Sequence, residues 1–495
     1  MIARSSLLGA FALAAVTAVA GCTAPSQDAA VTTGESKLTE RKIVSQTTFV
    51  TGSSASYQSD ADASLAAACA DAGAKQQAIA GARFLDALCG PGTNVSTGSN
   101  YLMGATLTTR WVIDVVDAKA PASVRTTSLT GDSASYMSDA TASWAKACAA
   151  ELERAKALFG ERLLGGGCDA PKNVSHGSSY IMGSAFHAFV LPGMGARASL
   201  NASVVGASAS YESDGLAAWK AACESWGKSV IAVSGTHLVN ADCGEPRNIS
   251  TGTNYIFGST ATLAVEGDDA NAPAASAGLF SAGASASYLS DGLVAWQTAC
   301  TANLGVAKEL LGDRLLAGGC AAPKQLSTGT NYVMGASSPI IVTSAGATKI
   351  TLEGYVFSAS ASYFSDAQAS IGKTSVAALR NAVARVGASR VEGFEVAEAK
   401  NVSTGTNYLF GAKTTLLLGV DLPEGSQTLS QPGTVKGERA SYQADAAASW
   451  TKACDDAIDK SKTTYGTRFL AASCGEPTYD GSGTYTSSIA TWLVL

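Results

Sequence analysis

Apolar residues recur at helical spacing in a segment that occurs six times along the chain. In its second copy they follow one another at intervals of four, four, three and four residues: Trp144, Cys148, Leu152, Ala155 and Phe159. This spacing places them on one face of an α-helix. An aspartate precedes each segment and a glycine follows it, which suits the N-cap or first turn and the C-terminal position of a helix. The pattern therefore predicts one helix of about 20 residues in each copy.

Shorter apolar runs flank each predicted helix. In the second copy, one run follows the helix at residues 162–164, and another extends to about residue 190 after a polar turn. A further run precedes each helix, as at residues 349–352. Short alternating runs bounded by turn residues are typical of β-strands. Each copy is therefore predicted to fold as a β-α-β-β unit.

An Ala-Ser-Tyr motif marks every copy, and its tyrosines are 75 to 79 residues apart: Tyr57, Tyr136, Tyr211, Tyr288, Tyr363 and Tyr442. Repetition at a near-constant period is the signature of tandem repeated domains. We therefore predict an α+β fold of six tandem small domains. These are units 1 to 6 below, at residues 41–118, 119–193, 194–268, 269–345, 346–422 and 423–495.

Ten of the eleven cysteines occupy two fixed positions of the repeat, one on the predicted helix and one at the end of the next strand: Cys69/Cys89, Cys148/Cys168, Cys223/Cys243, Cys300/Cys320 and Cys454/Cys474. Unit 5 lacks both, with Ser375 at the first position and no cysteine near Glu395. Joint loss favours one disulfide within each of the other units. Two cysteines per unit are too few ligands for a metal site, and no histidine recurs in the units to complete one.

The remaining cysteine, Cys22, follows an apolar run at residues 7–20. This run is too short to span a bilayer as a helix and fits a signal peptide. Residues Val19-Ala20-Gly21-Cys22 resemble the lipobox of bacterial lipoproteins. The resemblance implies cleavage of a signal peptide at residues 1–21, a lipid on the Cys22 sulfur and an acylated amino group, such as a palmitate amide.

The residue after Cys22 is Thr23, whereas lipoproteins kept at the inner membrane usually carry Asp there. The resemblance therefore favours the bacterial outer membrane, with residues 22–40 as a flexible tether. Ordinary secretion with cleavage at the A-x-A pattern of residues 18–20 is the alternative.

A polar turn before the last strand of each unit is the main candidate for binding. Its Ser, Thr, Asn and Tyr side chains suit recognition of carbohydrate or protein, but the same residue types also build structural turns. The candidate residues are Asn94, Asn100, Tyr101, Asn173, Tyr180, Asn248, Asn254, Tyr255, Asn331, Tyr332, Asn401, Asn407 and Tyr408.

Unit 6 alone replaces this turn, at residues 478–485, although its helix and cysteines are intact. This pattern favours a junction role, in which each turn contacts the following unit. Asn173 and its neighbours are then predicted to lie within contact distance of unit 3.

Tryptophan occupies one helix position in four units, where the other two units have Leu65 and Ile371: Trp144, Trp219, Trp296 and Trp450. Aliphatic replacement favours a core position over a sugar-stacking surface.

Composition narrows the possible functions. The net charge of −6 provides no basic field for nucleic acid. Three histidines disfavour a histidine-built metal centre, and no cofactor is predicted. The sequence thus predicts a non-enzymatic, lipid-anchored envelope protein that acts as a structural spacer or assembly protein. A multivalent adhesin for carbohydrate or protein is the alternative, and an enzyme of unknown class is a third.

Overall fold

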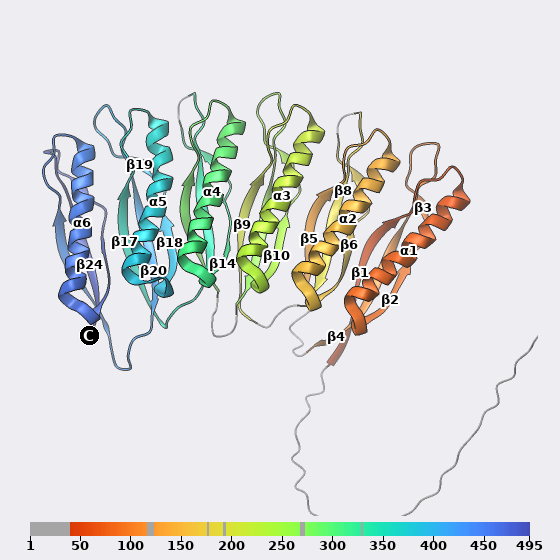
Figure 1. The fold of residues 1–495 in the computed structure, drawn as a ribbon, viewed down its shortest axis with the longest axis horizontal. Coiled ribbons are helices and arrows are strands. Elements are labelled where there is room, and N and C mark those ends of the chain that lie inside the picture. Colours follow the sequence, from red (N-terminus) through yellow and green to blue (C-terminus); the bar gives the residue numbers. More distant parts are fainter. Residues whose placement is uncertain (1–39, 116–122, 176–177, 192–194, 268–272, 328–329) are drawn as a thin grey trace, which may run out of the picture. The chain divides into compact units, whose positions relative to one another are not determined.

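Each unit begins with a strand that leads into one long helix (Figure 1). The computed structural model describes residues 40–115, 123–175, 178–191, 195–267, 273–327 and 330–495. The predicted signal peptide, Cys22 and the predicted tether up to residue 39 lie outside the described residues.

The six helices all have 23 residues: α1 (Gln58–Ala80), α2 (Met137–Phe159), α3 (Glu212–Ser234), α4 (Leu289–Leu311), α5 (Phe364–Val386) and α6 (Gln443–Tyr465). Each starts three residues earlier than predicted. The motif tyrosine is therefore the N-cap residue, and the aspartate lies in the first turn, where its charge complements the helix dipole. The glycine after α2, Gly160, has φ 52°, which permits the sharp exit from the helix.

Four strands complete each unit. The first strands are β1 (Glu40–Thr51), β5 (Ser123–Thr130), β9 (Arg197–Val205), β13 (Pro273–Ala282), β17 (Thr348–Phe357) and β21 (Thr428–Lys436). The strands after the helices are β2 (Phe84–Cys89), β6 (Leu163–Cys168), β10 (Leu238–Cys243), β14 (Leu315–Gly318), β18 (Val391–Val396) and β22 (Phe469–Cys474).

Two-residue strands come next: β3 (Thr93–Asn94), β7 (Lys172–Asn173), β11 (Arg247–Asn248), β15 (Lys324–Gln325), β19 (Lys400–Asn401) and β23 (Thr478–Tyr479). The last strands are β4 (Met103–Val115), β8 (Met182–Val190), β12 (Phe257–Glu266), β16 (Met334–Thr343), β20 (Phe410–Val420) and β24 (Tyr485–Val494).

Every sheet is antiparallel, and the last strand of the unit lies at its centre. The first strand pairs with one side of this central strand, while the second strand and the two-residue strand pair with the other, as in β1-β4-β2 with β3 on β4. The predicted α+β repeat is confirmed. The sequence did not predict the two-residue strand, because two residues carry no detectable alternation.

All five predicted disulfides form within single units and join the helix to the end of the following strand. Their Cα–Cα distances are 5.9–6.2 Å, as is usual for disulfides.

Unit 5 has two buried residues of different chemistry at the positions that the bridge occupies in the other units. Ser375 is fully buried, and its Oγ accepts a hydrogen bond from the backbone N–H of Phe280 in unit 4 at 3.1 Å. One extra residue before β18 moves Val396, rather than Glu395, to the position where the other strands end in cysteine. Val396 is 3% exposed, so an apolar contact occupies the place of the second sulfur.

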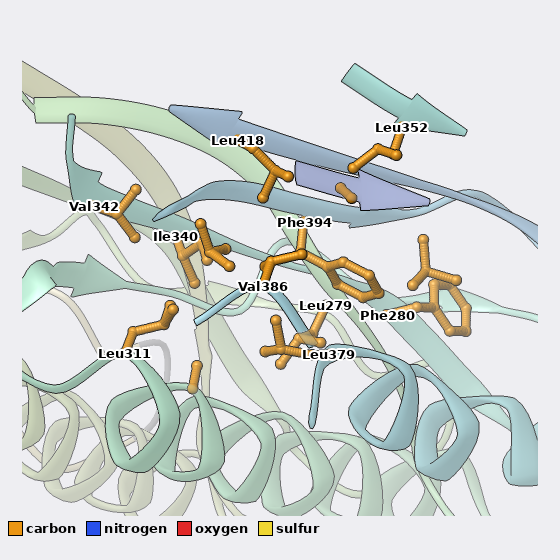
Figure 2. Packing of buried hydrophobic residues seen from close by; sticks show 14 of the residues in the cluster. Leu279, Phe280, Leu311, Ile340, Val342, Leu352, Leu379, Val386, Phe394 and Leu418 are labelled. Atoms are coloured by element: carbon orange, nitrogen blue, oxygen red, sulfur yellow. The ribbon is translucent and has the colours of Figure 1, made fainter. Parts of the chain in front are cut away.

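The tryptophans are core residues, as predicted: Trp144, Trp219, Trp296 and Trp450 are each at most 1% exposed. The cores also continue from one unit to the next. Figure 2 shows Leu311 and Ile340 of unit 4 in one cluster with Leu379 and Phe394 of unit 5.

Consecutive units pack side by side in chain order (Figure 1). At the first junction, Leu164 sits in a bulge of β6 and packs against Trp111 and Ile113 of unit 1. The Gln76 side chain of unit 1 also donates a hydrogen bond to the Gly166 carbonyl and accepts one from the Gly166 N–H. Residues 40–495 therefore form one interlocked body.

Candidate functional site

In units 1, 2, 3 and 5, the asparagine that opens the polar turn holds the turn together. Asn94 Oδ1 accepts hydrogen bonds from the Ser96 N–H at 3.1 Å, the Ser96 hydroxyl at 2.9 Å and the Leu102 N–H at 3.1 Å. Asn173 and Asn248 make equivalent sets of three bonds, and Asn401 accepts the two bonds from Ser403. These side chains act as structural Asx-type acceptors.

The tyrosine that closes each turn also has a local role. Its backbone forms an isolated bridge with the alanine of the Ala-Ser-Tyr motif, as in Ala55 with Tyr101. A Cβ added at Gly215 would lie 3.0 Å from the Cβ of Tyr255. The half-buried turn tyrosine therefore packs against the first helical turn, where only a small residue fits.

The turns contact the following unit. Thr97 donates a hydrogen bond to Met137 Sδ at 3.4 Å. The N–H of Thr404 donates one to Gln443 Oε1 at 2.8 Å. Both acceptors directly follow a motif tyrosine, so the turn of one unit touches the start of the next helix.

Two further junctions use apolar and backbone groups of the same turns. Gln368 of unit 5 donates to the Leu326 carbonyl at 3.1 Å. Val174, next to Asn173, packs against the cluster that contains Leu216 and Trp219 of unit 3. Both asparagines of these turns are exposed: Asn94, Asn173, Asn248 and Asn401 at the start of the turn, and Asn100, Asn254, Asn331 and Asn407 before the turn tyrosine.

Unit 6 differs from the prediction at this turn. Tyr485 pairs with Tyr479, as Met103 pairs with Asn94, and it is buried in the core. Gly483, with φ 103°, occupies the place of the turn tyrosine and accepts a hydrogen bond from the Ala440 N–H. Three fewer residues in the loop account for this shift.

The motif tyrosines are the surface feature that the sequence did not single out. Their exposed fractions are nearly identical, from 70% to 74%: Tyr57, Tyr136, Tyr211, Tyr288, Tyr363 and Tyr442. Each is a helix N-cap, yet none makes a side-chain capping hydrogen bond. Ser, Thr, Asp or Asn would satisfy the first N–H groups of a helix, and tyrosine does not.

Apart from the serine of the motif, the other residues shared by all six copies have a role within the fold. The alanine of the motif pairs with the turn, the aspartate lies in the first helical turn, and the glycine ends the helix. The tyrosine supports neither core nor cap. Its presence in all six copies was visible in the sequence, but its exposure was not.

The tyrosines share one end of each unit with the polar turns and the first helical turns. We call this surface the helix N-terminal face: residues 53–62, 132–141, 207–216, 284–293, 359–368 and 438–447, with the described turn residues 94–101, 173–175, 178–180, 248–255, 325–327, 330–332, 401–408 and 478–484. It carries eleven acidic residues and one basic residue, Arg439. The face is therefore aromatic and strongly acidic.

Hollows lie between neighbouring units. One of about 290 Å³ between units 2 and 3 is lined in part by Asp132 and Asp214 of the helix N-terminal face, and an open one of about 1020 Å³ lies at the helix C-terminal ends of units 4 to 6, beside Arg314, Arg390 and Arg468.

Three smaller hollows lie between neighbouring helices. One of about 270 Å³ lies between units 5 and 6 beside Trp450, and others of about 200 and 260 Å³ lie at the first two junctions beside Trp144 and Trp219. Small-molecule sites usually exceed about 300 Å³. These three spaces recur at equivalent positions. We attribute them to the helix faces at the junctions, which are rich in small alanine side chains.

The histidines within the described residues are tied to neighbouring strands. His187 lies between Thr126 Oγ1, at 3.0 Å from Nδ1, and Asp169 Oδ2, at 2.9 Å from Nε2. His237 Nδ1 lies 3.0 Å from the carbonyl of Glu266. His176 lies outside the described residues. Among the described residues, no three His, Cys, Asp or Glu side chains are grouped so that they could hold a metal ion.

None of the helices that the structure describes is long and apolar enough to cross a membrane. No protein-family model, curated protein or solved structure matches this chain.

Proposed function

We propose that this chain is a lipid-anchored, non-enzymatic protein of the bacterial envelope that acts as a structural spacer or assembly protein. The observation that carries this proposal is the interlocking of the six units. Hydrophobic clusters cross the junctions, as Leu164 does between units 1 and 2 and Leu470 between units 5 and 6. Burying such side chains contributes about 1.5–3 kcal/mol each.

Continuous packing suits a spacer because the units resist bending independently. Flexible linkers would leave each domain to move alone. Here the backbone N–H of Ser203 in unit 3 donates to the Cys320 carbonyl of unit 4 at 2.6 Å, in addition to the side-chain contacts. The disulfides add stability to each small unit, which suits an oxidising, extracytoplasmic compartment.

The anchor is tested by replacing Cys22 with Ala. The wild-type protein is expected in the membrane fraction and the variant in the soluble fraction. A matched Cys69→Ala and Cys89→Ala variant removes two sulfurs but keeps the lipobox, so it should stay with the membrane. Membrane association of the Cys22→Ala variant would refute the lipid anchor.

A second candidate function is multivalent binding of a protein or glycan, in which the repeats present copies of one site. Six motif tyrosines with equal exposure favour it, together with the asparagines that remain exposed on the polar turns. Linked copies of a weak site give a much higher overall affinity than one copy.

A further inference from the structure

The helix N-terminal face presents six copies of one exposed side-chain pair. Each copy has the motif tyrosine at the N-cap and, three residues later, an exposed aspartate in the first turn, as in Tyr136 and Asp139. A large aromatic ring in solvent costs free energy without a partner, and here it also displaces a good capping residue. All six units place this exposed tyrosine at a position where a capping residue would stabilise the helix. This repeated departure indicates that the tyrosine serves contact with a partner and not the stability of its own unit.

The contacts between units hold these pairs in place. Met137 directly follows Tyr136 and accepts the hydrogen bond of Thr97, and Gln443 directly follows Tyr442 and bonds to Thr404. The turn of one unit therefore supports the backbone that carries the next tyrosine. The turn residues thus position the tyrosines, and they need not touch a ligand themselves.

Charge identifies the kind of partner. The face carries eleven acidic residues against Arg439 alone, whereas the whole chain has 40 acidic and 34 basic residues. A surface with this field repels polyanions and attracts cations. The face of a tyrosine ring also attracts ammonium and guanidinium groups, and an adjacent carboxylate adds a charge-assisted hydrogen bond. A neutral glycan could stack on the rings but would gain nothing from the excess of carboxylates.

We infer that the helix N-terminal face binds a lysine- and arginine-rich segment of a partner protein, whose cations lie over the motif tyrosines and beside the aspartates. The inference rests on the multivalent candidate function and names its partner class. It is independent of the lipid anchor, so fractionation of the Cys22→Ala variant and the binding experiment can fail separately.

The test uses the full mature chain and a 24-residue peptide of alternating lysine and glycine, with binding followed by fluorescence anisotropy. Controls are the same peptide with acetylated lysines, a polyglutamate peptide and a neutral dextran. We expect binding of the lysine peptide only, with an affinity that falls as salt increases. Equal binding of the acetylated peptide, or preferred binding of dextran, would overturn the inference.

Variants of the motif tyrosines distinguish the contribution of the aromatic rings to binding from that of the negative charge of the face. Replacing all six motif tyrosines with Ser should weaken binding at least tenfold, while replacement with Phe should preserve most of it, because the aromatic face is kept. Serine is a better N-cap, so lost binding in the first variant cannot result from unfolding. Unchanged binding after the Ser replacements would refute the proposal.

A charge-matched pair completes the test. One variant neutralises the six first-turn aspartates: Asp60, Asp139, Asp214, Asp291, Asp366 and Asp445. The control neutralises six exposed carboxylates away from the face: Glu153, Glu161, Glu309, Asp313, Glu424 and Asp456. Both change the net charge equally, and only the first should weaken binding severalfold. Equal losses would show non-specific attraction and overturn the site.

Discussion

Tyr136 and Trp144 lie two turns apart on α2 and have opposite environments. Trp144 is 1% exposed and donates a hydrogen bond from Nε1 to Ser184 Oγ at 3.0 Å, whereas Tyr136 is 71% exposed. At the residue scale, two aromatic positions of the repeat therefore serve different purposes. One stabilises the unit, and the other is available to a partner.

This contrast gives a paired prediction. Trp144→Ala should lower the free energy of opening of α2 by about 3–5 kcal/mol, since it leaves a large cavity. Tyr136→Ser should instead raise it by about 1 kcal/mol, because Ser caps the helix. Hydrogen exchange of the α2 amides measures both. A Tyr136→Ser variant as unstable as Trp144→Ala would mean that the tyrosine packs in the folded protein.

A second residue-scale prediction concerns Tyr355, which packs edge-on against Phe357 near the junction of units 5 and 6. Burial, together with the nearby Glu476 carboxylate, raises the pKa of Tyr355 to about 12. The neutral phenol is thus favoured in the folded state. Its contribution to stability is complete below the unfolded value, about 10, and is lost as pH rises from 10 toward 12.

The measurement is the free energy of unfolding of unit 5 between pH 9 and pH 11, followed by hydrogen exchange in wild type and Tyr355→Phe. The free energy of unfolding should decrease less steeply with pH in the variant, because phenylalanine cannot ionise. Identical slopes in the two proteins would contradict the assignment.

At the scale of the element, unit 5 has buried residues without sulfur at both cysteine positions. Ser375 bonds to Phe280 of unit 4, and Val396 fills the other position. The unit therefore replaces an internal covalent link with contacts to its neighbour. The missing bridge therefore does not by itself make unit 5 the first unit to open.

Replacing both Ser375 and Val396 with Cys tests this view. The new bridge would close a loop of about 20 residues, worth about 3 kcal/mol in the chain-entropy model. Loss of the Ser375 hydroxyl leaves a buried N–H poorly satisfied, at a cost of about 1–3 kcal/mol. The free energy of opening of α5, measured by hydrogen exchange, should therefore rise by less than 3 kcal/mol in the oxidised variant. The reduced variant should be less stable than wild type. A full gain of about 3 kcal/mol would show that the Phe280 bond contributes little.

At the scale of the whole molecule, stability is shared across junctions. Gln76 is 4% exposed in unit 1, but both of its hydrogen bonds go to Gly166 of unit 2. One side chain thus satisfies the N–H and the carbonyl of a buried residue in the next unit.

Gln76→Ala should therefore destabilise the neighbour as well as its own unit. Two buried backbone groups lose their partners, and we expect a loss of about 2–4 kcal/mol in the protection of β6. Lys75→Ala on the same helix is the control, because Lys75 is exposed and pairs with Asp71 within α1. Loss of protection confined to unit 1 would show that the units unfold independently.

The sequence by itself determined the repeat, the order of the long elements and the pairing of the cysteines. These features follow from local periodicity and from spacing that recurs six times, so one chain provides its own comparison. Trp144 and its equivalents could be assigned to the core because Leu65 and Ile371 replace them.

Only the tertiary structure decided which repeated residues face outward. Units 1 to 5 each contain an equivalent of Tyr136 and an equivalent of Tyr180. Tyr136 is exposed, whereas Tyr180 packs against a helix. Exposure depends on the bridge between two segments more than 40 residues apart and on the neighbouring unit. Periodicity along the chain carries no information on such contacts. For this reason the sequence predicted the polar turns, and not the motif tyrosines, as the binding surface.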